Sequence, residues 1–198
     1  MSDLNYNNLK TALMAVFSGE EAGHLAMLLN SVWQADIILY ETVGLPDEIK
    51  DDYILMAYAE RLLLPQASHT GGGAWQERCT TLLPGSIFVM PPVVYELIKT
   101  AHDSGRFNPD AAVQNVFRNK GPQNADQLAA FFDTIKPHAV SYNIEAGLIE
   151  VLNRTTALQL DLHDTIDCYV MAGMMSPCPG RSLSSGFAWY EINPALYW

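Results

Sequence analysis

The spacing of hydrophobic residues predicts helices over most of the chain. In residues 20–42, Leu25, Leu28, Leu29 and Val32 recur at steps of three and four, which is the period of an amphipathic helix. The same stretch begins with two glutamates, which stabilise a helix N-terminus through the helix dipole. We therefore expect a long helix from about residue 20 to residue 42.

Residues 37–40 allow a second interpretation. The run Ile37-Ile38-Leu39-Tyr40 is apolar at every position, so its periodicity cannot separate a deeply buried helical turn from a strand. The helix is the preferred prediction, and Gly44 is expected to end it.

Proline, glycine and capping residues mark the ends of the other predicted helices. Pro46 begins one helix that Pro65 ends, and Asn108-Pro109-Asp110 begins another that Gly121-Pro122 ends, because proline suits the first helical turn and interrupts later ones. Further helices are expected over about 8–17, 93–104, 124–135, 143–153 and 156–175. The pattern predicts an all-α fold, a single-domain bundle of about seven to eight helices over residues 1–198, and no internal sequence repeat is visible.

Three segments depart from the helical pattern. Residues 66–86 contain three consecutive glycines, so a flexible loop is expected there. Residues 87–90 are short, apolar and β-prone, and they could form a minor two-stranded element with residues 187–192. The tail, residues 186–198, holds two Trp and two Tyr, and we expect it to pack on its own domain or on a neighbouring subunit, since a free aromatic tail is poorly soluble.

Composition excludes several classes of protein. Of the 198 residues, 49% are hydrophobic and 17% are charged, which is too apolar for a disordered chain. The formal net charge is −11 and the basic residues are scattered, so no nucleic-acid partner is predicted. The longest uncharged run, residues 79–95, contains three prolines, so no membrane span is predicted either.

The cysteines and the many apolar residues suggest a cellular location and a partner for the protein. Cys79, Cys168 and Cys178 form no Cys-x-x-Cys motif, and the N-terminus shows no secretion-signal pattern. We therefore expect free thiols and a cytoplasmic location. With few charged residues and many aromatic ones, some apolar surface should meet a partner, and a homodimer is the simplest expectation.

The sequence motifs of known catalytic sites are absent or incomplete. The chain has no Gly-x-Ser-x-Gly, Walker A or Gly-x-Gly-x-x-Gly motif. Glu21-Ala-Gly-His24 is one Glu-x-x-His motif, whereas a di-iron carboxylate bundle requires two. No metal or cofactor is therefore predicted.

The densest set of titratable residues lies in residues 161–168. His163 and Asp167 are four residues apart on a predicted helix and share a face, with Asp164 beside them. His138 precedes the previous helix and would approach if that helix returned antiparallel. These four residues, His138, His163, Asp164 and Asp167, are the candidate ligand-binding residues, although a solvated helix face would show the same pattern.

Two functional hypotheses follow. The preferred one is a non-catalytic binding or regulatory module that acts on a protein partner or an apolar small molecule. The alternative is a helical enzyme, with or without a metal, in which one of the two histidines is the general base and an aspartate orients it. That alternative requires the four candidate residues to meet in one pocket, with at least one shielded from water.

Overall fold

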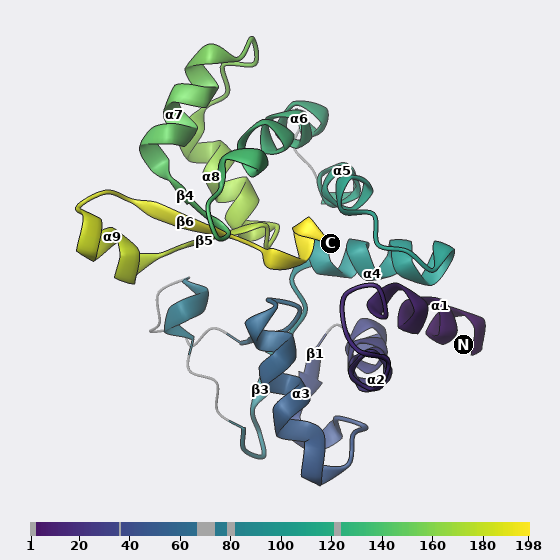
Figure 1. Cartoon of the computed structure of the whole chain (residues 1–198). Helices are drawn as coiled ribbons and strands as arrows, with labels where there is room; N and C mark the ends of the chain where they lie inside the picture. Colours follow the sequence, from purple (N-terminus) through teal and green to yellow (C-terminus); the bar gives the residue numbers. More distant parts are fainter. Residues whose placement is uncertain (1–2, 36, 67–73, 79–81, 121–123) are drawn as a thin grey trace.

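The computed structural model describes residues 3–35, 37–66, 74–78, 82–120 and 124–198. Helices dominate these residues, and two small three-stranded antiparallel sheets complete the fold (Figure 1). The helices are α1 (Asp3–Leu13), α2 (Gly19–Ala35), α3 (Asp47–Ala59), α4 (Pro92–Ser104), α5 (Pro109–Lys120), α6 (Ala125–Ile135), α7 (Ala146–Thr155), α8 (Leu162–Met171) and α9 (Pro179–Ser185). Short 3₁₀ turns are η1 (Tyr40–Thr42), η2 (Trp75–Glu77), η3 (Lys136–His138) and η4 (Pro194–Tyr197).

The strands are β1 (Ile37–Leu39), β2 (Leu64–Pro65), β3 (Ile87–Val89), β4 (Asn143–Glu145), β5 (Met175–Pro177) and β6 (Trp189–Ile192). The mostly helical fold is confirmed, but the stricter all-α prediction is imprecise, because six strands form two sheets within the described residues. The predicted pairing of residues 87–90 with residues 187–192 is also wrong. β3 instead lies between β1 and β2, and β6 lies between β4 and β5.

The predicted helix over residues 20–42 ends early. α2 stops at Ala35, and Ile37–Leu39 forms β1, with Ile38 paired to Phe88 of β3. Ile38 is buried while Ile37 and Leu39 are exposed, the alternation of a strand. The apolar pattern of residues 37–39 fits a helix or a strand equally well. Pairing with the distant strand β3 therefore determines that these residues form a strand.

The two sheets have the same topology. In each unit a helix precedes a first strand, a helical segment and a further helix follow, and two more strands pair antiparallel. The last strand inserts between the other two, in the order β1-β3-β2 in the first unit and β4-β6-β5 in the second. The first unit comprises α2, β1, η1, α3, β2, η2 and β3, and the second comprises α6, η3, β4, α7, α8, β5, α9 and β6. The structure thus repeats an arrangement that the sequence does not reveal.

The two units meet through a buried polar junction. The Arg61 Nε donates to Glu191 Oε1 over 2.9 Å, and both side chains are nearly buried. Arg61 has a φ of +56°, a left-handed conformation that costs a non-glycine residue free energy. The Asn193 Nδ2 donates to the carbonyl oxygens of Arg61 and Gly173. Residues from both units therefore satisfy each other's buried polar groups.

The tail packs on its own chain. Within residues 186–198, Ile192, Asn193, Ala195 and Leu196 have no exposed surface. The Asn193 side chain accepts a hydrogen bond from the Ala195 backbone N–H and caps η4. Figure 1 shows this C-terminal turn at the centre of the molecule, beside α4.

The predicted flexible loop over residues 66–86 lies largely outside the described residues. Its described part includes η2, where Trp75 is buried and its backbone N–H donates to Ser176 Oγ. Among the described residues, no helix has both the length and the apolar character to cross a lipid bilayer. The buried apolar residues of α1–α8 and both sheets form one hydrophobic cluster.

His102 makes the stability of this core sensitive to acid. Its imidazole is 2% exposed, packs edge-on against Trp33 at 4.5 Å between ring centroids, and neither ring nitrogen has a hydrogen-bond partner among the described residues. Burial lowers the pKa of His102. The nearby Asp103 carboxylate raises this pKa, but by less than burial lowers it. The unfolded chain therefore takes up a proton at a higher pH than the folded chain.

We expect the contribution of His102 to the free energy of unfolding to be constant above about pH 6.5, the ordinary histidine pKa, and to fall as the pH drops below it. Urea unfolding of wild type and His102→Leu at several pH values measures this. The leucine variant should match or exceed wild-type stability and lose part of the pH dependence, because no unpaired nitrogen stays buried. An unchanged pH profile in His102→Leu would assign the acid sensitivity to other groups.

Candidate functional site

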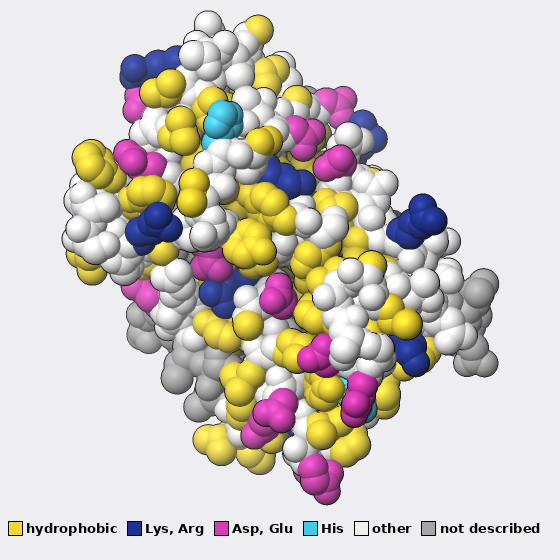
Figure 2. Space-filling model, viewed as in Figure 1, with side chains coloured by type: hydrophobic (Ala, Val, Ile, Leu, Met, Phe, Trp, Pro, Cys, Tyr) yellow, Lys and Arg dark blue, Asp and Glu magenta, His cyan; other side chains and the backbone are white. Residues whose placement is uncertain are grey.

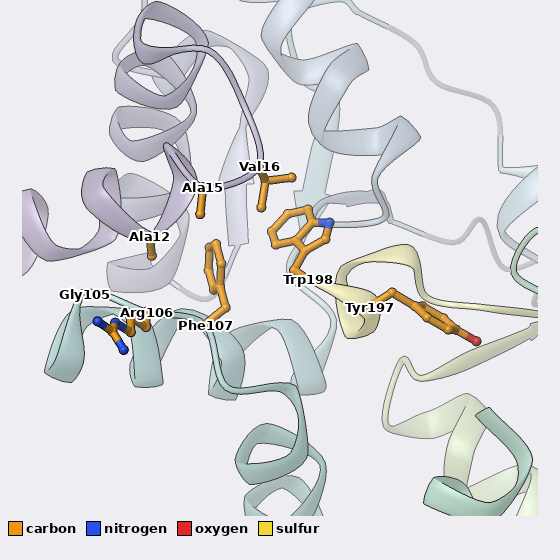
Figure 3. A pocket seen from close by; sticks show the side chains of 8 residues that line it. All are labelled: Ala12, Ala15, Val16, Gly105, Arg106, Phe107, Tyr197 and Trp198. Atoms are coloured by element: carbon orange, nitrogen blue, oxygen red, sulfur yellow. The ribbon is translucent and has the colours of Figure 1, made fainter. Parts of the chain in front are cut away.

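An open apolar groove of about 560 Å³ lies where the end of α1, the turn after α4 and the C-terminal turn meet (Figure 3). Figure 3 shows the rings of Phe107 and Trp198 in the middle, with Ala15 and Val16 beside them and Arg106 and Tyr197 toward opposite ends. We call it the aromatic groove, lined by Ala12, Ala15, Val16, Gly105, Arg106, Phe107, Tyr197 and Trp198.

Helix ends shape the aromatic groove. α1 ends at Leu13, and the turn that follows presents Ala15 and Val16, both exposed. Gly105 ends α4 with a φ of +71° and donates its N–H to the Ala101 carbonyl oxygen, a conformation that glycine adopts at little cost. The chain can therefore reverse at once and place Arg106 and Phe107 against the end of α1.

Aromatic packing fixes the floor of the groove. The Trp198 ring lies 5.5 Å from Phe17, edge to face, and 4.9 Å from Phe107. The Tyr197 hydroxyl donates to the Lys136 carbonyl oxygen, and burial raises the pKa of Tyr197 to about 12. Tyr197 is thus a neutral donor at physiological pH, held in one position.

The charge at the groove is opposite to that of the whole chain. Arg106 has the one charged side chain of the lining, is exposed, and has no ion-pair partner among the described residues. Hydrophobic side chains gather near the middle of the face shown in Figure 2, where Figure 1 places the C-terminal turn. The groove therefore offers aromatic surface beside a free cation on a chain with a net charge of −11.

The structure brings together three of the four candidate residues predicted from the sequence. His163 Nε2 lies 3.6 Å from Asp167 Oδ2, and both side chains are mostly exposed. Asp164 and Asp167 line a second cavity, of about 390 Å³, next to Cys168. His138 lies in η3, is exposed, and does not line that cavity.

This second cavity lacks the features of a nucleophilic site. Burial raises the pKa of the Cys168 thiol, and the charges of Asp164 and Asp167 raise it further, so little thiolate forms at neutral pH. The enzyme hypothesis requires at least one of the four candidate residues to be shielded from water, but His138, His163, Asp164 and Asp167 are all exposed. Among the described residues, no group of three or more His, Cys, Asp or Glu side chains could hold a metal ion.

The Glu-x-x-His motif on α2 serves the helix itself. The Ser18 backbone N–H donates to Glu21 Oε2, and the Glu21 backbone N–H donates to Ser18 Oγ, the reciprocal bonds of a capping box. These bonds from Ser18 lower the pKa of Glu21. The His24 ring packs 4.7 Å from Tyr53, so both residues of the motif have structural roles.

The sequence pattern marks the aromatic tail but not the other walls of the groove. Ala15 and Val16 lie inside the helix predicted over residues 8–17, whereas α1 ends at Leu13 in the structure. Gly105-Arg106-Phe107 follows the helix predicted over residues 93–104. An apolar residue just after a helix end is the one signal that could have pointed to Phe107, and it is a common feature of helix termini.

Comparison with known proteins gives one match. A protein-family model matches residues 7–198, almost the whole chain. No curated protein matches the chain, and no solved structure does. The function is therefore inferred from the residues and geometry of this chain.

Proposed function

The chain belongs to the family whose model matches residues 7–198, and we propose that it is a non-catalytic binding module whose aromatic groove holds an apolar, acid-bearing segment of a partner protein. The observation that carries this proposal is the row formed by the half-buried Phe107 and Trp198 and the exposed Tyr197, beside the unpaired Arg106. Trp, Tyr and Arg are the residue types that most often dominate the binding free energy of protein interfaces.

The shape and charge of the groove favour a polypeptide segment over an apolar small molecule. The lining residues form an open row with Arg106 and Tyr197 toward its ends (Figure 3), whereas small-molecule sites usually enclose most of the ligand surface. Arg106 can pair with an Asp or Glu of the segment, and its planar guanidinium suits a carboxylate. A homodimer and a cytoplasmic location, both expected from the sequence, are part of the same proposal.

Selection of peptides tests this function. A random peptide library is selected on wild-type protein and counter-selected on Val16→Glu, which places a carboxylate in the groove at an exposed position. We expect the enriched peptides to combine aromatic or leucine residues with Asp or Glu. Their Kd should weaken about tenfold or more with Val16→Glu, since the new carboxylate repels the acidic residues of the peptide and must be desolvated when an apolar side chain covers it.

Met14→Glu is the matched control. Met14 is also exposed at the end of α1 but does not line the groove, so this variant should bind the selected peptides like wild type. Peptides that bind both glutamate variants equally would contradict the proposal. An apolar small molecule retained by wild type but not by Val16→Glu in native mass spectrometry would assign the groove to such a ligand instead.

A further inference from the structure

The element order of the second unit is that of a winged helix. α7 and α8, joined by residues 156–161, take the place of the helix-turn-helix pair in that order, and β5, α9 and β6 take the place of the hairpin that follows it (Figure 1). The first unit repeats this order, with η1 in place of the first helix of the pair. In helix-turn-helix proteins the second helix is the recognition helix, which inserts into the major groove of DNA. α8 and α3 occupy that position here.

One face of α8 is anchored and the other is free. Thr165 and Tyr169 are buried, and the Tyr169 hydroxyl donates to the Leu128 carbonyl oxygen of α6. The opposite face carries Asp164, Asp167 and Met171, all exposed, and Met171 is 72% exposed. The exposed face of α8, the helix at the recognition position, thus presents carboxylates and a long apolar side chain.

A cavity gives this face a place for an apolar side chain. The 390 Å³ cavity has Leu128, Cys168 and Met171 in its wall together with Asp161, Asp164 and Asp167. Residues 155–180 contain neither Lys nor Arg. An apolar wall with carboxylates and no cation at the recognition position is complementary to a basic amphipathic helix and repels the phosphates of DNA.

The first unit shows the same chemistry at the equivalent position. α3 exposes Asp47, Glu48, Asp51 and Asp52, with Leu55 44% exposed one turn further on. Its one cation, Lys50, is buried and paired with Asp47 at 2.6 Å. Two recognition helices with unrelated sequences therefore present carboxylates beside an exposed apolar residue, which surface solubility alone does not require.

We infer that the outer face of α8, with the cavity beside it, is a docking surface for a basic amphipathic helix of a partner protein. An apolar residue of that helix enters the cavity against Leu128 and Met171, and its lysines or arginines lie over Asp164 and Asp167. This surface is separate from the aromatic groove and does not depend on its occupant.

A designed peptide tests the inference. The probe is a synthetic amphipathic helix of leucine and lysine, and its matched control carries glutamate in place of lysine. Fluorescence anisotropy gives Kd, and the methyl NMR signal of Met171 locates the complex. We expect the lysine peptide to bind and to shift Met171, and binding to weaken as salt rises. The glutamate peptide should not bind.

Charge-removal variants separate this surface from the general acidity of the chain. Asp164→Asn/Asp167→Asn should weaken binding of the lysine peptide about tenfold through loss of two ion pairs. Glu20→Gln/Asp103→Asn removes the same charge from exposed positions on α2 and α4 and should leave Kd nearly unchanged. Equal losses in both variants, or a lysine peptide that leaves Met171 unshifted, would overturn the inference. Binding of duplex DNA that the α8 variant abolishes would show a nucleic-acid surface instead.

Discussion

Glu191→Gln should destabilise the protein by about 3 kcal/mol or more, the typical effect of leaving a buried charge unpaired. Glu191 Oε1 accepts from Arg61 Nε, and its Oε2 accepts from the Gln76 amide. The Arg61 guanidinium also lies over the rings of Tyr58 and Trp75. The variant keeps the shape of the side chain but leaves this cation without its counter-charge between the two units. Urea unfolding followed by tryptophan fluorescence measures the loss.

Glu150→Gln is the control for that effect. Glu150 pairs with Arg154 on the exposed surface of α7, where an ion pair one helical turn apart contributes about 0.3–0.5 kcal/mol. The double variant Arg61→Met/Glu191→Leu should recover much of the lost stability, because it buries no unpaired charge. Similar losses in Glu191→Gln and Glu150→Gln would show that the junction is weaker than its burial indicates.

Gly173→Ala should be the most damaging single-methyl change, at about 3 kcal/mol or more. Gly173 has a φ of +71°, which costs alanine about 1–2 kcal/mol. A Cβ there would also lie 2.5 Å from Pro91 Cβ, and relieving such an overlap in a packed site costs about 1–3 kcal/mol more. The turn cannot move freely, because the Val93 backbone N–H donates to the Ala172 carbonyl oxygen beside it.

Gly186→Ala separates the cost of the left-handed backbone from the cost of the steric overlap. Gly186 has a similar φ, +76°, but no atom lies within 4 Å of its added Cβ. This variant should lose only the backbone part, about 1–2 kcal/mol. Thermal unfolding of both variants measures the difference. Equal losses would mean that the contact of Gly173 with Pro91 relaxes without cost.

The helices were predictable where local signals agree. Prolines and capping residues place the starts of α4, α5 and α6 within a residue or two of the structure, because these signals act within one turn. β1 was not predictable as a strand, since Ile37-Ile38-Leu39 suits either structure and its partner β3 is about fifty residues away. The shared topology of the two sheets could not be predicted from the sequence either, because it depends on pairing between distant segments.

The candidate site was predictable only in part. The aromatic tail stood out by composition, and the charge pattern of residues 161–168 identified the exposed face of α8. The aromatic groove, however, joins three segments that are far apart in sequence, the turn after α1, the turn after α4 and the C-terminal turn. His138 lies in η3 and does not line the cavity beside α8.

The outer strands of both sheets are poor templates for backbone pairing with another chain. The outer strands β1, β2, β4 and β5 are two or three residues long, too short to template another chain well. β2 ends in Pro65 and β5 ends in Pro177, each paired with the central strand of its sheet. Proline has no N–H to donate, and edge strands tolerate it where central strands do not. Both units thus carry the same protection against edge-to-edge aggregation, at equivalent positions.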